Sequence, residues 1–354
     1  MAFAYREAVS RRTLTLLLAS LLAVVMTLVM AVARVPYVAL APGPTFNTLG
    51  QLDGKPVISV KGHPTYDDTG HLNMTTISVV TRLTLVQALR GWFQHDLAVV
   101  PRDVIYPPDQ SDEQVRQEDQ AAMRDSQDSA TTAALRQLGV PGKVHVLVDK
   151  VVPKAPSQGK LMAADELVAI DGSPVTGAAQ LRALIGRRKP GDPVRVSYLR
   201  SGKPGEVTIV TGTAKDKDGS VRPIIGVDTR ERTDYPIKVT ISLSDVGGPS
   251  AGLMFALAIL DKLEPGSLTY GRFIAGTGTI DSDGKVGPIG GIQQKLIGAR
   301  RKGATVFLVP ADNCAEAVSG PPAGLKLIKV ASLKGALGEL QKLHTGAATT
   351  PCTG

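Results

Sequence analysis

The stretch from Thr13 to Ala33 contains no charged side chain, and its 21 residues constrain this chain more than any other feature does. As a helix that rises about 1.5 Å per residue, it would cover a hydrocarbon core of about 30 Å. We therefore expect a transmembrane anchor here. A cleavable signal peptide is the alternative, because Ala31-Val32-Ala33 has the A-x-A form of a cleavage site. The apolar run, however, exceeds the roughly 7–15 residues of a usual signal peptide core.

The charges on either side of this stretch predict its orientation. Arg6, Arg11 and Arg12 precede it with Glu7 as the one acid, whereas Arg34 is an isolated positive charge after it. Cytoplasmic flanks of membrane helices are enriched in Lys and Arg. We therefore expect a single-pass protein of the cell membrane, with its N-terminus in the cytoplasm and everything after Arg34 outside.

Composition limits what the remaining chain can do. With 354 residues, 43% hydrophobic and 20% charged, it is long enough for two folded soluble units. The net charge of +8 comes without a dense basic run interleaved with aromatics, so we expect no nucleic-acid partner. Cys314 and Cys352 are too far apart for a CxxC motif, and the five histidines form no ligand-spaced cluster, so we expect no metal and no cofactor. Outside the cytoplasm a disulfide between the two cysteines is permitted, and the sequence leaves it open.

Three segments lie between the apolar stretch and the middle of the chain. Residues 70–79, GHLNMTTISV, alternate and are rich in β-branched residues, which predicts a strand. Residues 83–99 have helical spacing through Leu85, Leu89, Trp92 and Phe93. Residues 107–129 are strongly polar, which indicates a solvated helix or a linker.

Residues 143–212 predict a small β-rich module with one helix. Within it, LMAADELVAIDGSPV at 161–175 resembles the signature of PDZ domains, with Ala164 where that pattern usually has Gly. The resemblance implies that a peptide adds as a strand beside the segment after Gly142, with Gly142 and Val144 in the binding site. The alternative, that the module only packs against the rest of the protein, stays open.

In the C-terminal part of the chain, two residues indicate nucleophilic catalysis. Ser250 follows Gly-Gly-Pro and precedes an apolar helix, which exposes its hydroxyl near free backbone N–H groups, although Ser is also a common helix N-cap. Lys295 lies in a predicted helix, and the small and apolar residues of that helix predict burial on one side. Burial disfavours the ammonium form and would leave a neutral amine able to take a proton from a serine.

GGPSAG at 247–252 and PIGGIQQK at 288–295 look like the two motifs of Lon-type proteases, and AGTGTI at 275–280 resembles a third segment of that family. The resemblance implies a Ser/Lys dyad, with Ser250 as nucleophile and Lys295 as general base. It also implies that Thr277 orients the lysine, and that the backbone N–H groups around Ser250, with Gly248 as the flexible approach, stabilise the oxyanion.

Two departures refine this expectation. Many Lon proteases have an Asp three residues before the serine, where this chain has Gly247, and the sequence contains no G-x-x-x-x-G-K-[ST] phosphate loop. We therefore expect an ATP-independent serine endopeptidase acting outside the cytoplasm on unfolded or membrane-associated polypeptides. Lon-type domains often assemble, so a homo-oligomer is compatible with the resemblance, without a predicted number of copies.

The expected fold is α+β, with an N-terminal transmembrane helix, a small β-rich PDZ-like domain and a Lon-type proteolytic domain. Residues 70–79 also resemble the opening strand of Lon-type catalytic domains, so the PDZ-like domain is expected to be inserted within the peptidase fold. The segments in chain order are a cytoplasmic N-terminus (1–12), a transmembrane anchor (13–33), an extracytoplasmic region that could open the peptidase fold (34–138), a PDZ-like domain (139–215), a Lon-type Ser/Lys peptidase domain (230–345) and a flexible tail (346–354).

Two other functions fit parts of the sequence. Residues 248–252 also satisfy G-x-S-x-G, the nucleophile motif of α/β-hydrolase esterases, which would need a downstream histidine, and only His344 follows Ser250. The other is a non-catalytic membrane scaffold that binds peptides through its PDZ-like domain. An intact Ser250 and Lys295 favour the peptidase over that scaffold.

Overall fold

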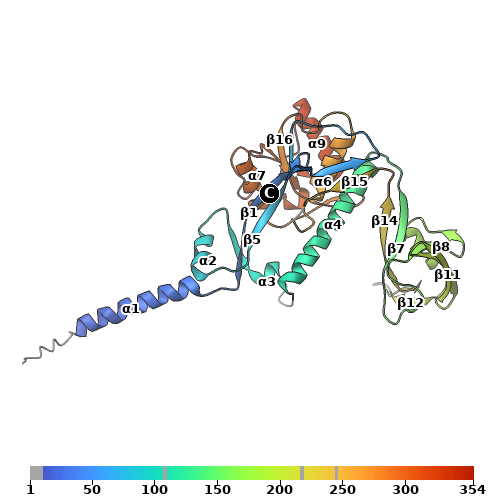
Figure 1. The fold of residues 1–354 in the computed structure, drawn as a ribbon, viewed down its shortest axis with the longest axis horizontal. Coiled ribbons are helices and arrows are strands. Elements are labelled where there is room, and N and C mark those ends of the chain that lie inside the picture. The colour runs from blue at the N-terminus through green and yellow to red at the C-terminus, as the bar shows by residue number, and fades with distance from the viewer. Residues whose placement is uncertain (1–10, 107–109, 216–218, 244–245) are drawn as a thin grey trace, which may run out of the picture. The chain divides into compact units, whose positions relative to one another are not determined.

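A computed structural model describes residues 11–106, 110–215, 219–243 and 246–354 (Figure 1). The chain forms two compact units. Unit 2 is Gly139–Lys238, and unit 1 comprises the described residues on either side of it.

Unit 1 begins with α1 (Arg11–Val32), which is exposed along nearly its whole length. Residues Arg12–Val32 are long and apolar enough to cross a membrane, a property that signal sequences share. Behind α1, the backbone N–H of Val35 donates to Leu83 O at 3.0 Å, and that of Leu85 donates to Ala33 O at 3.1 Å. These bonds join the end of α1 to the start of α2 (Leu85–Trp92).

A six-stranded mixed sheet forms the centre of unit 1, in the order β20-β19-β16-β5-β1-β6. The first four strands are parallel to one another, whereas β1 is antiparallel to both β5 and β6. Pairing of His71 with Phe273 joins β5 to β16 across more than 200 residues of sequence, which is the pairing that an inserted module requires. The strands are β1 (Tyr37–Asn47), β5 (His71–Val80), β6 (Ala98–Pro101), β16 (Phe273–Gly276), β19 (Val306–Pro310) and β20 (Lys326–Val330).

Two helices, α6 (Gly252–Leu263) and α7 (Ile292–Lys302), cover opposite faces of this sheet. Ala275 packs in a cluster with residues of α7, whereas the neighbouring Gly276 faces Met254 of α6. Successive residues of a strand point to opposite faces, so the two helices lie on different sides. Every residue of α6 is buried, because α4, α9 and β5 surround it.

The polar segment expected as a solvated helix or a linker is a helix over its described part. It belongs to α4 (Asp112–Gln137), which Ser111 caps in a capping box with Gln114. From Met123 onward it buries one side, including Ala130, Ala133 and Ala134, and α4 packs against α6. The linker alternative is wrong because small residues on one face of α4 give it a surface to pack.

The remaining elements of unit 1 are the helix α9, which packs against α6, and short elements that connect the main ones. They are β2 (Gln51–Leu52), β3 (Lys55–Pro56), β4 (Ile58–Lys61), α3 (Arg102–Ile105), β15 (Lys238–Ile241, where unit 2 joins unit 1), β17 (Thr279–Ile280), β18 (Val286–Gly287), a 3-10 turn at Ala311–Asn313, α8 (Cys314–Ala317) and α9 (Leu333–Thr345).

Unit 2 is a β-sheet with one helix, and its main strand order is β11-β10-β8-β7-β14. It extends beyond the predicted 139–215 because β14 completes the sheet by pairing with β7, with Asp234 opposite Lys143. Ala164 has a positive φ of 68°, which explains why the PDZ pattern has Gly at this turn. The elements are β7 (Lys143–Val151), β8 (Glu166–Ile170), β9 (Ser173–Pro174), α5 (Ala178–Gly186), β10 (Pro193–Arg200), β11 (Lys203–Val210), β12 (Gly212–Lys215), β13 (Val221–Ile224) and β14 (Val227–Asp234).

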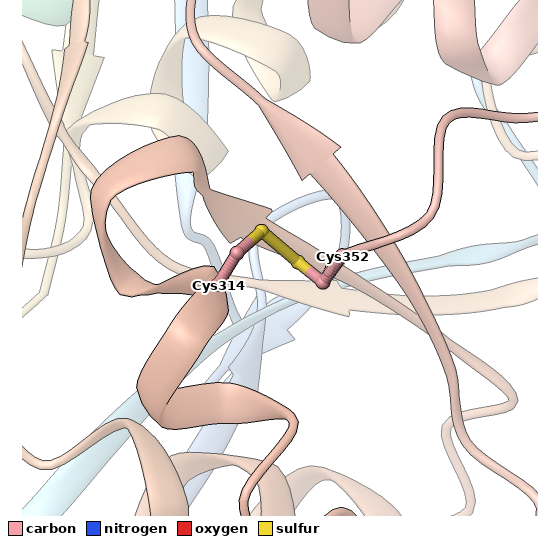
Figure 2. Close-up of a disulfide and its surroundings, with 2 residues drawn as sticks. All are labelled: Cys314 and Cys352. Carbon is pink, nitrogen blue, oxygen red and sulfur yellow. A yellow bond between two sulfur atoms is a disulfide. The ribbon is translucent and has the colours of Figure 1, made fainter. Parts of the chain in front are cut away.

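The C-terminal segment is attached to unit 1, contrary to the flexible tail expected over 346–354. Figure 2 shows the disulfide that joins Cys352 to Cys314. Glu339 accepts hydrogen bonds from the backbone N–H of Thr350 at 2.7 Å and from its hydroxyl at 2.8 Å. The backbone N–H of Lys329 donates to Thr350 O at 3.0 Å. Thr350 and Cys352 thus have specific partners, which a glycine- and threonine-rich composition does not reveal.

Candidate active site

Ser250 lies in a turn directly before α6, and α4 holds the loop that leads to it. The backbone N–H of Gly248 donates to the carbonyl of Asp119 at 2.9 Å, and Ser126 Oγ donates to Pro249 O at 2.9 Å. Gly248 has a φ of +82°, which a residue with a side chain rarely adopts. The glycine-rich sequence thus lets the loop turn sharply while α4 supports it.

Lys295 of α7 lies against Ser250. Its Nζ is 2.7 Å from Ser250 Oγ and 3.0 Å from Thr277 Oγ1. The side chain is only 2% exposed, and within the described residues no carboxylate lies within ion-pair distance of it. Burial lowers the pKa of Lys295 to about 7. An amine with this pKa is substantially neutral at physiological pH and can accept a proton.

Thr277 follows β16 and is fully buried between the other two residues. Its Oγ1 donates to the carbonyl of Ser250 at 2.9 Å. A hydroxyl has one hydrogen, so its lone pairs are left to accept from the Lys295 amine. This arrangement fixes the amine in place and leaves its own lone pair for the Ser250 hydroxyl.

The backbone N–H groups around Ser250 are the ones expected to stabilise an oxyanion. The Gly248 N–H points to Asp119 O and is not free in this conformation. In the described parts of the chain, the backbone N–H groups of Ser250 and Ala251 have no hydrogen-bond acceptor. They lie at the N-terminal end of α6, where the helix dipole also favours negative charge.

A cleft of about 740 Å³ opens beside Ser250 and Lys295. One wall is the face of α4 that presents Val115, Asp119 and Met123. Burial raises the pKa of Asp119, and repulsion from the Glu118 carboxylate adds a smaller increase. These residues were not predicted, although their spacing of four marks one helical face. Other lining residues include Phe46, Met74, Ile77, Tyr106, Val246 and Gly290.

The predicted peptide site in unit 2 needs correction. Gly142 directly precedes β7, and Val144 is the second residue of that strand. Since β7 is an inner strand between β8 and β14, it has no free edge for a peptide strand. The end strands of this sheet are β11 and β14, and β14 is the one beside β7. With α5 it lines a cavity of about 730 Å³, whose walls include Leu181, Arg182, Ile185, Val227, Asp228 and Thr229.

The structure does not support an esterase site. The ring of His344, the histidine that such a site would need, stacks on Tyr270 with 3.4 Å between ring centroids. The group beside Ser250 that can act as a base is Lys295.

Comparison with known proteins gives two family matches. Residues 225–339 match the Lon protease (S16) C-terminal proteolytic domain, and residues 114–211 match the PDZ domain. The Lon match includes Ser250, Thr277 and Lys295. The PDZ match begins on α4, although the structure places α4 in unit 1, where it packs on α6.

Individual relatives cover parts of the chain. It is 30% identical over 135 residues to Lon protease of Ureaplasma parvum, and 35% identical over 127 residues to Lon protease 1 of Sorangium cellulosum. These matches cover 34% and 35% of this chain but only 17% and 15% of those relatives. The solved PDZ domain of the SdrC-like protein from Listeria monocytogenes is 30% identical, covering 24% of this chain and 85% of that one, with a TM-score of 0.22.

The matches to the Lon proteolytic domain support a serine peptidase of the Lon type. The chain therefore contains a Lon protease (S16) C-terminal proteolytic domain and a PDZ domain behind an N-terminal apolar helix.

Proposed function

We propose that this protein is an ATP-independent serine endopeptidase that cleaves unfolded or membrane-associated polypeptides, with Ser250 as nucleophile and Lys295 as general base. The observation that carries the proposal is the 2.7 Å contact between Ser250 Oγ and the buried amine of Lys295. The phosphate-loop motif of ATPases is absent from these 354 residues, which supports cleavage without ATP.

The proposed reaction has two stages. Neutral Lys295 takes the Ser250 proton as Oγ attacks the scissile carbonyl, and the N–H groups of Ser250 and Ala251 stabilise the oxyanion. The Lys295 ammonium then gives this proton to the departing amine of the substrate. Ser250 is now joined to the acyl part of the substrate as an ester. Lys295 next takes a proton from water, which attacks the ester, and returns it to Ser250 Oγ as the acid product leaves.

Polypeptide binding by unit 2 forms the second part of the proposal. A peptide in extended conformation would add to the free edge of β14 and place side chains in the cavity beside α5. Leu181 and Ile185 of α5 make the wall of that cavity apolar, which favours a hydrophobic peptide side chain. The unit would thereby retain substrates for the peptidase.

The proposed location is the outer side of the cell membrane. The length of α1 and the arginines at and before its start support an anchor with a cytoplasmic N-terminus. The disulfide between Cys314 and Cys352 supports an oxidising compartment for the domains that follow. A homo-oligomer is part of the proposal without a stated number of copies, and light scattering of the detergent-solubilised chain would measure it.

The test is hydrolysis of fluorescently labelled casein, an unfolded protein, by the full chain in detergent, with and without Mg-ATP. Activity should vanish in Ser250→Ala and in Lys295→Ala, and ATP should not change it. Wild-type activity should rise with pH through an apparent pKa of about 7, because the deprotonated amine of Lys295 is the active form.

His344→Ala is the control for the esterase reading and should leave hydrolysis unchanged. Activity that survives in Lys295→Ala but disappears in His344→Ala would contradict the proposed dyad. Peptide binding without hydrolysis in every form would favour the scaffold instead.

A further inference from the structure

Helix α2 presents an apolar face to the outside of unit 1. Leu89, Trp92 and Phe93 are 40%, 54% and 84% exposed, respectively. Their spacing places them on one side of the helix, with Phe93 as its C-cap residue. The sequence pattern alone would bury such a stripe in a core, but the structure does not.

The small residues of α2 explain why its large ones point outward. Ala88 and Gly91 are buried, and a Cβ atom on Gly91 would lie 2.6 Å from a methyl of Val99 in β6. The helix therefore packs closely on the sheet through this side and cannot rotate its aromatic side inward. Trp92 also makes an edge contact with Tyr37, with 5.8 Å between the ring centroids.

The apolar face lies next to the end of the apolar helix α1. The two backbone hydrogen bonds from Val35 to Leu83 and from Leu85 to Ala33 fix the start of α2 to the residues that follow α1. An isolated bridge between Arg34 and Thr84 adds to this connection. The place where a membrane span would leave the hydrocarbon core is therefore also where α2 begins.

We propose that α2 is a second membrane contact, in which Leu89, Trp92 and Phe93 insert into the interface of the bilayer that α1 spans. Tryptophan is enriched at the water boundary of membranes, and the apolar faces of interfacial helices enter it by about 5–10 Å. Arg90 is exposed beside these residues and can reach lipid phosphates. This inference rests on the proposed membrane anchor and adds a fixed tilt of unit 1 against the bilayer, because a helix packed on the sheet would rest on the surface.

The chain provides its own probe, because Trp92 is its single tryptophan. The full chain is reconstituted into vesicles of phosphatidylcholine, either unmodified or brominated near the top of the acyl chains. We expect most of the Trp92 fluorescence to be lost in the brominated vesicles. Leu89→Ser combined with Phe93→Ser should weaken the quenching, whereas the chain should still float with the vesicles through α1.

A matched control moves the probe away from α2. Trp92 contacts Tyr37 of β1, near the Val80 end of β5, and the control places a tryptophan near the opposite end. The variant combines Trp92→Phe with Tyr270→Trp, at an exposed position three residues before β16. β16 begins opposite His71, and the 10 residues of β5 put about 30 Å between that end and Val80. We expect no quenching of this tryptophan.

Three results would overturn the proposal. The first is equal quenching of the tryptophans at positions 92 and 270. The second is no quenching of Trp92 in a chain that floats with vesicles, as would also be seen if a second copy of the chain covered Trp92 and shielded it from the brominated lipid. Both leave the anchor, and with it the proposed location, intact. The third is failure of the chain to float, which would reject the anchor and the interfacial contact together, while casein hydrolysis in detergent would still report on the dyad.

Discussion

Lys295 owes its chemistry to burial, with no charged partner within ion-pair distance in the described parts of unit 1. Desolvation lowers its pKa from 10.5 to about 7. Between these two pH values the unfolded chain binds one more proton than the folded chain, so the free energy of unfolding rises with pH across this window. The same burial that makes the lysine a base therefore destabilises the fold at neutral and acidic pH.

Replacing the lysine should separate catalysis from stability. Lys295→Met should abolish casein hydrolysis but raise the free energy of unfolding at pH 6, by up to about 5 kcal/mol from the lost desolvation cost. The gain should shrink toward pH 10, because that pH is close to 10.5, the pKa of a lysine in the unfolded chain, above which both forms of the chain hold the amine neutral. Thermal unfolding in detergent at both pH values, followed by circular dichroism, measures this. A pH-independent difference would contradict the low pKa.

Thr277 should act by positioning the amine. Thr277→Val keeps the shape but removes the hydroxyl between Lys295 and the Ser250 carbonyl, so kcat should fall roughly 10- to 100-fold, as for a lost interaction of about 1–3 kcal/mol. KM should change little, because the substrate does not contact this buried side chain. Thr277→Ser should restore most of the activity. A loss of stability without a change in kcat would point to a structural role only.

At the scale of elements, helix α4 packs against the loop that carries Ser250 and supports it. Gly247 stands where many Lon proteases have an acid, and the side chain of Asp119 in α4 occupies the adjacent space. A Cβ on Gly247 would lie 2.8 Å from the Cβ of Asp119. The nucleophile loop and α4 are therefore closely packed, and a change in one should move the other.

Gly247→Ala tests this packing. The added methyl should push the loop from α4 and break the bond between the Gly248 N–H and Asp119 O, lowering kcat/KM about 10-fold or more. Gly290→Ala adds a methyl to the same cleft with no atom within 4 Å and should retain near wild-type activity. Peptide hydrolysis by both variants is the measurement, and equal effects would contradict the predicted coupling.

Pattern predicted the elements better than it predicted their surroundings. The apolar helix expected after Ser250 begins at Gly252 as α6, and the helix around Lys295 is α7. Residues 83–99 were expected to have helical spacing throughout, but the helix ends at Trp92 and strand β6 follows from Ala98. Helical spacing identifies an apolar face but does not show whether protein, water or lipid covers it. The apolar side of α2, for example, is exposed on unit 1.

For the whole molecule, the disulfide and the inserted unit define how distant segments meet. Cys314 and Cys352 are 38 residues apart, and their bond closes the C-terminal segment onto unit 1 (Figure 2). Unit 2 interrupts unit 1 between Leu138 and Val239, and its own first and last strands pair with each other. An insertion with adjacent ends lets β5 and β16 pair as if unit 2 were a loop.

Removing the disulfide should lower stability. Cys352→Ser should cost about 2–4 kcal/mol, because the bond restricts the unfolded chain, and should lower the melting temperature by several degrees. Dithiothreitol should destabilise the wild-type chain to the same extent and leave the variant unchanged. Equal melting temperatures of wild type and variant, with and without dithiothreitol, would contradict this.

The sequence by itself determined the apolar helix, the two domain types and the candidate dyad, because each depends on local spacing or a short motif. The tertiary structure decided that Lys295 lies 2.7 Å from Ser250, that α4 forms a wall of the cleft, that β14 is the free edge in place of β7, and that the C-terminal segment is bound. These depend on contacts between residues far apart in the chain. Hydrophobic periodicity describes each segment alone and carries no information about which segment packs against it.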